Sequence, residues 1–456
     1  MSAATFKDDF LREAPPLLKL ALPLIAAQIT FVSMGTVDTI LAGRLGARQL
    51  AAVAVGTNLW FMLFVLFMGL FMACSPIVAQ RVGGGRDAAG TGALVRGASL
   101  LALVAGLAWW LAMRVATGPM LDLLELDPET RGYALGYLHA VGWATVPYCL
   151  CFVLRNAAEG MGLTPVPLAA GVAGLVVNAL SAWGLMYGKA GLPALGPAGA
   201  GWAMVLGALA MLATYVLEYL RRPALRALQV FRPGWPPWRA AVAEVLRLGG
   251  PIALILAAEA WLFMVGALML ARFGSDVIAA HQIAINFASV TFMVPLSVGL
   301  ATTVRVGYAA GAGNRAEVRR RGLTGIAMGA AFALFSAALM ALAPALIVSI
   351  YTDAATVAPL AARFLGFAAL FQMFDCVQAT ANGALRGLKD TRMPMLITLT
   401  AYWGIGAPLA AGLAFRTAVG PAGIWWGFIA GLGAAALGLG WRFLSKTSPR
   451  RPVLMA

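Results

Sequence analysis

The stretch Pro251–Ala271, PIALILAAEAWLFMVGALMLA, is apolar along its whole length except for Glu259 near its middle. It is about 20 residues long, the length that an α-helix needs to cross the hydrocarbon core of a bilayer. A carboxylate at that depth costs at least about 2.5–3.5 kcal/mol, so it is seldom present without a role. The alternative is a structural acid paired with a buried arginine, but this stretch contains no lysine or arginine. We therefore interpret Glu259 as a functional acid that lines a polar cavity between helices.

The composition of the chain extends this interpretation to the whole protein. Hydrophobic residues make up 61% of the 456 residues and charged residues only 11%, and apolar runs of similar length recur from end to end. A soluble fold cannot bury so much apolar surface, whereas helices that face lipid need not bury it. We predict an all-α membrane protein with about twelve transmembrane helices.

The net charge of +15 would suggest a nucleic-acid partner in a soluble chain. Here most of the 33 lysines and arginines fall between apolar runs, in the segments that share one side if the N-terminus is cytoplasmic. This is the pattern of the positive-inside rule. We expect both termini in the cytoplasm and no nucleic-acid partner. The first 20 residues contain acids and prolines ahead of the first apolar run, which is not the pattern of a cleavable signal peptide.

The two halves of the chain resemble each other. Pro23 aligns with Pro251, and Gly46 aligns with Gly274 at the same spacing. A parallel repeat of six spans is a transporter architecture in which the substrate binds between the halves. We predict two pseudo-symmetric six-helix lobes, with residues 1–220 as the N-lobe and 249–456 as the C-lobe. The basic segment 221–248 between them is rich in proline and tryptophan, as expected of a cytoplasmic linker at the membrane surface.

In the N-lobe, the first apolar span ends with an acid. Asp38 and Gln28 fall on one helical face, which suggests an inward-facing acid with a polar companion. A solvated acid at a helix end is the alternative. Pro23 removes a backbone donor early in the same span and is a candidate hinge. Asn178, in the middle of the fifth span, is either a helix-packing residue or a ligand of the site.

A second group of polar residues lies in the C-lobe. The segment FQMFDCVQATANGALRG places four residues on one helical stripe, Asp375, Gln378, Asn382 and Arg386, with Phe371 one turn before the acid. On another span, two further amides occur at helical spacing, Gln282 and Asn286. Two acids with amides can replace the hydration shell of a small cation or hold a proton. They could also neutralise a cationic organic substrate. For each amide alone, an interhelical hydrogen bond is an equally good interpretation.

Three segments resemble the multidrug and toxic compound extrusion (MATE) family, in its NorM-like bacterial branch. They are GTVDTILAGRLG (35–46), AEAWLFMVGALMLARFGSDVIAAHQIAINFASVTFMVPL (258–296) and FDCVQATANGALRGLKDTRMP (374–394). The resemblance implies a twelve-helix, two-lobed antiporter of the bacterial inner membrane. Such a protein expels cationic or amphipathic drugs in exchange for H⁺ or Na⁺, uses no cofactor and is not an enzyme. We expect it to be a monomer in the lipid bilayer.

The resemblance also assigns roles to particular residues. It places the coupling carboxylates at Glu259 and Asp375, where Na⁺ could bind, and at Asp38. Asn178 looks like the first of two polar residues usual beside the N-lobe acid, but Ala182 stands where the second is expected. A tyrosine common one turn before the second C-lobe acid is Phe371 here. Both departures remove oxygen ligands, which favours H⁺ over Na⁺.

Two other classes of function remain as alternatives. A flippase of a lipid-linked precursor shares this architecture, but it would require basic residues in the central cavity to hold pyrophosphate. A membrane enzyme such as a prenyltransferase would require clustered metal-binding acids. Asp8 and Asp9 are the only adjacent acids, and they lie in the N-terminal segment. The four cysteines match no metal-site spacing.

Overall fold

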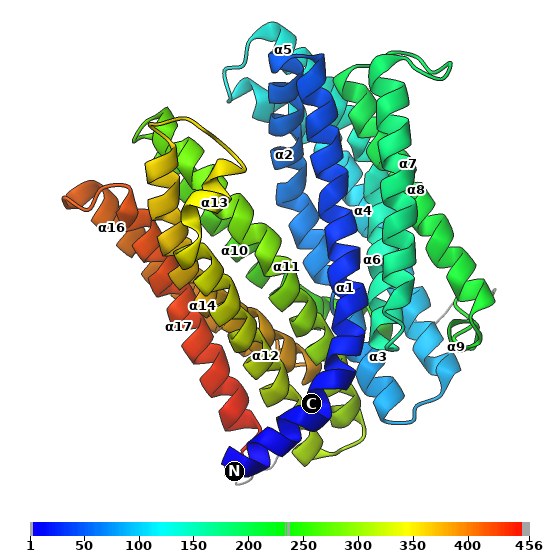
Figure 1. The fold of residues 1–456 in the computed structure, drawn as a ribbon. Coiled ribbons are helices and arrows are strands. Elements are labelled where there is room, and N and C mark those ends of the chain that lie inside the picture. Colours follow the sequence, from blue (N-terminus) through cyan, green and yellow to red (C-terminus); the bar gives the residue numbers. More distant parts are fainter. Residues whose placement is uncertain (1–2, 233, 235–237, 449–456) are drawn as a thin grey trace. The chain divides into compact units, whose positions relative to one another are not determined.

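The computed structural model describes residues 3–232, 234 and 238–448, so four residues of the predicted linker (233 and 235–237) lie outside the described part. Every regular element in the described part is helical (Figure 1). In it, 12 helical segments are long and apolar enough to cross a membrane. The prediction of an all-α membrane protein with twelve transmembrane helices is therefore confirmed.

The first half of the chain forms six of these crossings. Its helices are α1 (Ala3–Leu45), α2 (Ala47–Phe71), α3 (Cys74–Gly83), α4 (Ala88–Asp122), α5 (Pro128–Val141), η1 (Gly142–Ala144), α6 (Thr145–Gly160), α7 (Pro165–Tyr187), α8 (Pro197–Arg221) and the short α9 (Pro223–Arg226). The helix α5 begins after Asp127, whose carboxylate accepts a hydrogen bond from the Thr130 backbone N–H at 3.0 Å. A hydrogen bond from the Thr130 side chain, together with this backbone one, lowers the pKa of Asp127, because both favour its ionised form.

The second half repeats this arrangement. Its helices are α10 (Trp238–Ala271), α11 (Ser275–Gly311), α12 (Arg315–Leu342), α13 (Pro344–Ser349), α14 (Ala358–Gly387), α15 (Arg392–Leu399), η2 (Thr400–Gly406), α16 (Ala407–Arg416) and α17 (Ala422–Lys446). One crossing, residues 392–416, is not a regular α-helix. Its middle third, η2, is a π-helical segment. Such wide turns are rare and occur frequently at functional sites.

The chain forms two compact units. The C-terminal unit contains the chain from Leu254 onward, the part of α1 up to Ile25 and the short piece Gly83–Gly85. The N-terminal unit contains Ala26–Val82 and Arg86–Ala253. Two helices, α1 and α10, therefore each begin in one unit and end in the other. The change comes two residues after Pro23 in α1 and two residues after Pro251 in α10. These two prolines are the pair that the internal repeat aligns.

The helix α14 is the centre of the C-terminal unit and packs against α11, α12 and α17 (Figure 1). Two glycines bring it close to α11, because a Cβ atom added to Gly383 would lie 2.3 Å from the carbonyl oxygen of Gly299. At the same level the Thr303 hydroxyl donates to the Gly383 carbonyl oxygen at 2.8 Å. Small residues of this kind let the backbones of membrane helices come into contact.

We predict that Gly383→Ala destabilises the protein by about 1–3 kcal/mol, because the added methyl group overpacks the contact between α11 and α14. Gly366 provides a matched control on the same helix, since a Cβ atom there meets no atom within 4 Å. Gly366→Ala should be neutral or slightly stabilising. Thermal unfolding in detergent measures both changes. An equal effect of the two substitutions would contradict the proposed close contact.

Within the N-terminal unit, α7 and α5 pack against α8, and α4 packs against α6. A cluster of aromatic rings joins α2 to α4 and α6, with Trp60 at 5.3 Å from Trp109 and Phe64 at 5.8 Å from Tyr148, between ring centroids. The four cysteines are all buried and unpaired.

Candidate functional site

The C-terminal unit brings two carboxyl groups together in its interior. Glu259 lies on α10 and Asp375 on α14, and the two groups are close enough to interact electrostatically. Asp375 is 3% exposed, and its Oδ1 atom has no hydrogen-bond partner among the described residues. An unpartnered buried carboxylate oxygen is costly unless an ion or a proton satisfies it. The sequence predicted these two acids as the site, and the fold places them in one unit within electrostatic range of each other.

The hydroxyl of Tyr402 also belongs to this acid group. It donates a hydrogen bond to Glu259 Oε2 at 3.3 Å from the π-helical segment η2. In the next position, the Trp403 indole N–H donates to the Ala258 carbonyl oxygen at 3.3 Å, which holds α10 against η2. Sequence reasoning missed Tyr402. The available signal was a lone tyrosine hydroxyl within an otherwise apolar crossing.

The polar residues of the α14 stripe do not all face the acid group. The Gln378 side chain faces Glu259, whereas the buried Asn382 Oδ1 atom has no hydrogen-bond partner in the described part of the chain. Phe371, one turn before Asp375, is buried against Phe263 at 5.6 Å between ring centroids. Phe371 therefore forms an apolar wall and offers no oxygen to the site.

The amides on α11 are arranged differently. Gln282 and Asn286 are exposed, and Asn286 Oδ1 accepts a hydrogen bond from the Tyr351 hydroxyl at 3.0 Å. The pKa of Tyr351 is raised by its partial burial. The neighbouring His281 is buried with its ring 5.3 Å from the ring of Trp425. The fold thus does not bring the α11 amides into the hydrogen-bonded group around Glu259.

The N-terminal unit holds its own buried acid. Asp38 on α1 is 3% exposed, and the Asn178 side-chain amide of α7 donates to its Oδ1 atom at 3.4 Å. Asn178 is completely buried, and its own Oδ1 atom has no partner among the described residues. Asp38 is therefore enclosed within the unit, unlike a solvated acid at a helix end. Ala182 is buried one turn after Asn178 and adds no oxygen.

Gln28 has a different partner from the one that its helical face suggests. Its Oε1 atom accepts a hydrogen bond from Arg155 Nη2 at 2.9 Å, and Arg155 Nε also donates to Glu159 Oε1 at 2.7 Å. Arg155 is thus a half-buried cation that is neutralised by a buried acid of its own helix α6. The Arg155–Glu159 pair was not found from the sequence, although the two residues are four apart, the spacing of helix neighbours.

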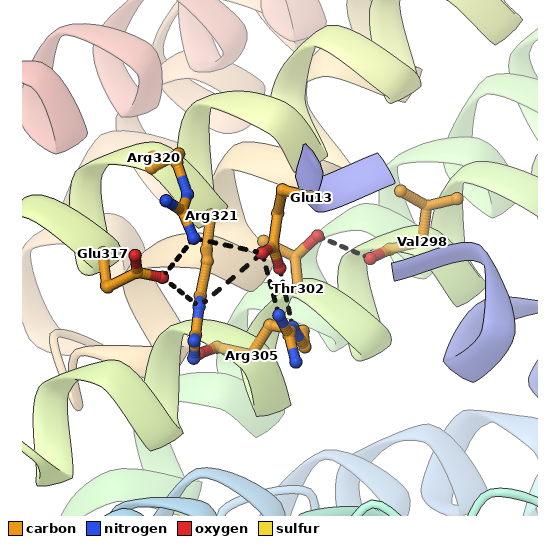
Figure 2. Close-up of polar contacts among 7 residues, drawn as sticks. All are labelled: Glu13, Val298, Thr302, Arg305, Glu317, Arg320 and Arg321. Atoms are coloured by element: carbon orange, nitrogen blue, oxygen red, sulfur yellow. Dashed lines mark hydrogen bonds and ion pairs between the residues drawn. The ribbon is translucent and has the colours of Figure 1, made fainter. Parts of the chain in front are cut away.

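A third buried group fixes the beginning of α1 inside the C-terminal unit (Figure 2). The carboxylate of Glu13 accepts two hydrogen bonds from Arg305 of α11, at 2.6 and 2.8 Å. Arg320 and Arg321 of α12 lie 3.8 Å from the same carboxylate, and both pair with Glu317. The side chain of Glu13 is 2% exposed. This bidentate arrangement is the strongest geometry available to an arginine and a carboxylate.

A family model described as MatE matches the chain twice, at residues 23–183 and 251–411. The chain belongs to the MATE family. The two matches begin at Pro23 and Pro251, so each half of the chain is one copy of the MATE repeat. The MATE family needs no cofactor. In the described part of the chain, no three His, Cys, Asp or Glu side chains gather in a way that could hold a metal ion.

Curated relatives agree with this membership. The chain is 39% identical over 435 residues to "Multidrug resistance protein PmpM" of Pseudomonas aeruginosa, covering 93% of this chain and 90% of that one. It is 37% identical over 435 residues to "Multidrug resistance protein NorM" of Vibrio vulnificus, covering 94% and 95%. This MATE protein is therefore a multidrug efflux transporter. Its twelve apolar helices and bacterial relatives indicate a multi-pass protein of the inner membrane.

Solved MATE structures share the fold. The eukaryotic MATE transporter AtDTX14 superimposes with a TM-score of 0.84 at 21% identity, covering 95% of this chain and 96% of that one. An outward-facing multidrug resistance MATE transporter superimposes with a TM-score of 0.83 at 19% identity, covering 94% and 96%. The two-lobed, twelve-helix fold that the sequence predicted is thus the MATE fold.

Proposed function

We propose that the protein is an antiporter that expels cationic or amphipathic drugs from the cytoplasm in exchange for H⁺ or Na⁺. The observation that carries this proposal is the group of the half-buried Glu259 with the buried Asp375 and Tyr402 in the C-terminal unit. Two acids within electrostatic range of each other repel when both are ionised, and the charge of the buried Arg386 offsets part of that repulsion at Glu259. Binding of a cation or a proton relieves that repulsion, so occupancy of the pair is sensitive to the ion gradient.

In the proposed cycle, the ion binds the acid pair from outside, and the drug is released outward. The loaded protein then changes to the inward-facing state, releases the ion and takes up new drug from the cytoplasm or the inner leaflet. One elementary charge that moves through 100 mV supplies about 2.3 kcal/mol, which supports about fiftyfold accumulation. Buried carboxylates also attract a cationic drug, so ion and drug compete for the same charge.

For the coupling ion, we favour H⁺ over Na⁺. A Na⁺ ion would take oxygen ligands from Glu259 and Asp375, and Tyr402 could add a hydroxyl. Phe371 and Ala182 offer none at the two positions where an oxygen is expected from the family resemblance. A proton needs only one carboxyl group of the pair, so it makes fewer demands on the surrounding side chains.

We further propose that α1 and α10 are the elements that bend during the cycle. Each passes from one compact unit to the other close to Pro23 or Pro251, and a proline weakens the helix at that point. In this proposal the lobes comprise residues 1–220 and 249–456, joined by the linker 221–248. The basic residues between the spans support cytoplasmic termini. We expect the monomer to be the functional form.

The test is drug transport in everted membrane vesicles, with pH and Na⁺ gradients imposed separately. Coupled antiport predicts drug accumulation under at least one gradient and none when both are collapsed. Accumulation that is independent of both gradients would contradict the proposal. Translocation of a lipid-linked precursor, without transport of any cationic drug, would instead favour the flippase alternative.

We predict that Asp38→Asn impairs gradient-driven efflux severalfold without preventing membrane insertion, because Asp38 is buried on the helix that carries the proposed hinge. Asp276→Asn, at the exposed start of α11, is the matched control and should leave efflux unchanged. Efflux per amount of folded protein in vesicles measures both. Wild-type efflux from Asp38→Asn would remove Asp38 from the mechanism.

A further inference from the structure

The N-terminal unit contains an apolar cavity of about 460 Å³ that none of the proposed transport residues lines. Its walls come from three membrane-spanning helices, α4, α6 and α8, and from Val230, Phe231 and Gly234, which follow α9. Leucines are the commonest lining residues, with Leu100 on α4, Leu150 on α6 and Leu212 on α8. A cavity of this volume and lining suits a hydrocarbon chain.

One end of the cavity is basic. Arg96 of α4 lines it, and its Nη1 atom donates to the backbone carbonyl oxygens of Gln229 at 3.2 Å and Arg232 at 3.5 Å. The Nε atom of Arg96 is buried and has no hydrogen-bond partner among the described residues. A donor in that position needs an acceptor oxygen, which a bound anion can supply.

A second hollow of about 500 Å³ adjoins this end, since both are lined by Val230 and Phe231. It is lined in addition by Arg226 and Arg232, whose side chains are exposed. In the described part of the chain, neither these two arginines nor Arg96 has an acidic partner within ion-pair distance. The three guanidinium groups therefore leave a local excess of positive charge beside an apolar cavity.

The basic end and the apolar end of the cavity lie in the same order across the membrane as the headgroup and the acyl chain of a lipid in one leaflet. Arg96 lies near the start of α4, and Leu103 is seven residues further along the same helix. At 1.5 Å per residue the cavity therefore extends about 10 Å along α4, from the basic end toward the middle of the membrane. On α6 and α8, Leu154 and Val216 lie near the helix ends, whereas Leu150 and Leu212 lie one turn deeper. A phospholipid has its charge and its acyl chain in this order.

We propose that this cavity binds an anionic phospholipid of the leaflet that contacts the basic linker. The acyl chain occupies the leucine-lined cavity, and the phosphate accepts hydrogen bonds from Arg96 and the neighbouring arginines. A cationic drug is excluded by the same charges, so this site is separate from the proposed transport site. Binding also holds the segment after α9 against α4, because Arg96 contacts both the lipid and the Gln229 carbonyl.

Native mass spectrometry of the detergent-purified full-length protein tests the proposal, with phosphatidylglycerol and the net-neutral phosphatidylethanolamine as probes. The wild type should retain phosphatidylglycerol, and combining Arg96→Gln, Arg226→Gln and Arg232→Gln should weaken that retention on the order of 100-fold. If the triple variant does not fold, the double variant at the two exposed arginines is used, and a smaller but measurable loss is expected. Arg114→Gln is the matched control, since Arg114 lies further along α4 and stacks on Trp110 and Trp143.

Two further arms separate a lipid site from simple anion binding. Leu103→Trp fills the apolar end without changing the arginines, and it should also release phosphatidylglycerol. Inorganic phosphate at equal concentration should not displace the lipid. Equal retention of the two lipids, unchanged retention in Leu103→Trp, or full displacement by inorganic phosphate would each overturn the proposal.

Discussion

Glu259→Gln and Asp375→Asn are each expected to abolish gradient-driven drug accumulation. At 100 mV this is a loss of about fiftyfold, because the variant can no longer convert ion entry into drug exit. The amide side chains keep the shape of the acids, so the protein should still insert and still bind drug. Accumulation in proteoliposomes under an imposed ion gradient, normalised to folded protein, is the measurement.

Combining the two substitutions tests whether the acids act as a unit. If they share one ion, the double variant should lose little more than either single variant, since effects within a unit are not additive. Asp353→Asn, in an exposed loop, should behave as wild type. Tyr402→Phe should give an intermediate loss, because it removes the hydroxyl that donates to Glu259. Full gradient-driven accumulation by either single acid variant would eliminate the shared-site mechanism.

Glu13→Gln is expected to cost about 3–5 kcal/mol of stability. Arg305 is partly buried, and the substitution removes the carboxylate that accepts its two hydrogen bonds. Glu13 holds the start of α1 to α11 and α12 (Figure 2), so the same substitution should also free that start from the C-terminal unit. The midpoint of thermal unfolding in detergent and the yield of monodisperse protein both report the loss. The expected result is a large decrease in each.

A matched control exists at the start of the other helix that joins the two units. Glu244 of α10 accepts a hydrogen bond from Arg81 at 2.8 Å, but the Glu244 side chain is 29% exposed, against 2% for Glu13. Water screens a more exposed ion pair, so Glu244→Gln should cost about 1 kcal/mol or less. Glu13→Gln with an effect no larger than that of Glu244→Gln would show that Glu13 is not an important anchor of α1.

Much of the architecture could be predicted from residue patterns alone. Apolar runs of bilayer length, the alignment of Pro23 with Pro251 and the positions of the basic residues predicted twelve helices in two related halves. A bilayer makes this prediction possible, because every spanning backbone must satisfy its own hydrogen bonds as a helix. The same rule made Glu259 and Asp375 conspicuous, since an acid in an apolar span is costly wherever it occurs.

The contacts between helices could not be predicted in the same way. Helical spacing suggested Gln28 as the companion of Asp38. In the fold, Gln28 instead accepts a hydrogen bond from Arg155, and Asn178 donates one to Asp38. A stripe on one helix shows which side chains share a face but not which helix that face meets. The exposed Asn286 is a second example, because its partner Tyr351 comes from a loop 65 residues away.

The sequence by itself determined the class of the protein, the number of its helices, its family and the acids that carry charge into the membrane. These properties depend on local composition. Each apolar run forms a spanning helix because of its own length and hydrophobicity, independently of the other runs. Only the tertiary structure paired Glu259 with Tyr402, anchored Glu13 among three arginines and formed the cavity beside Arg96. Those features depend on how distant helices pack, and packing is decided by side-chain shape and hydrogen bonding between segments that have no fixed spacing in the sequence.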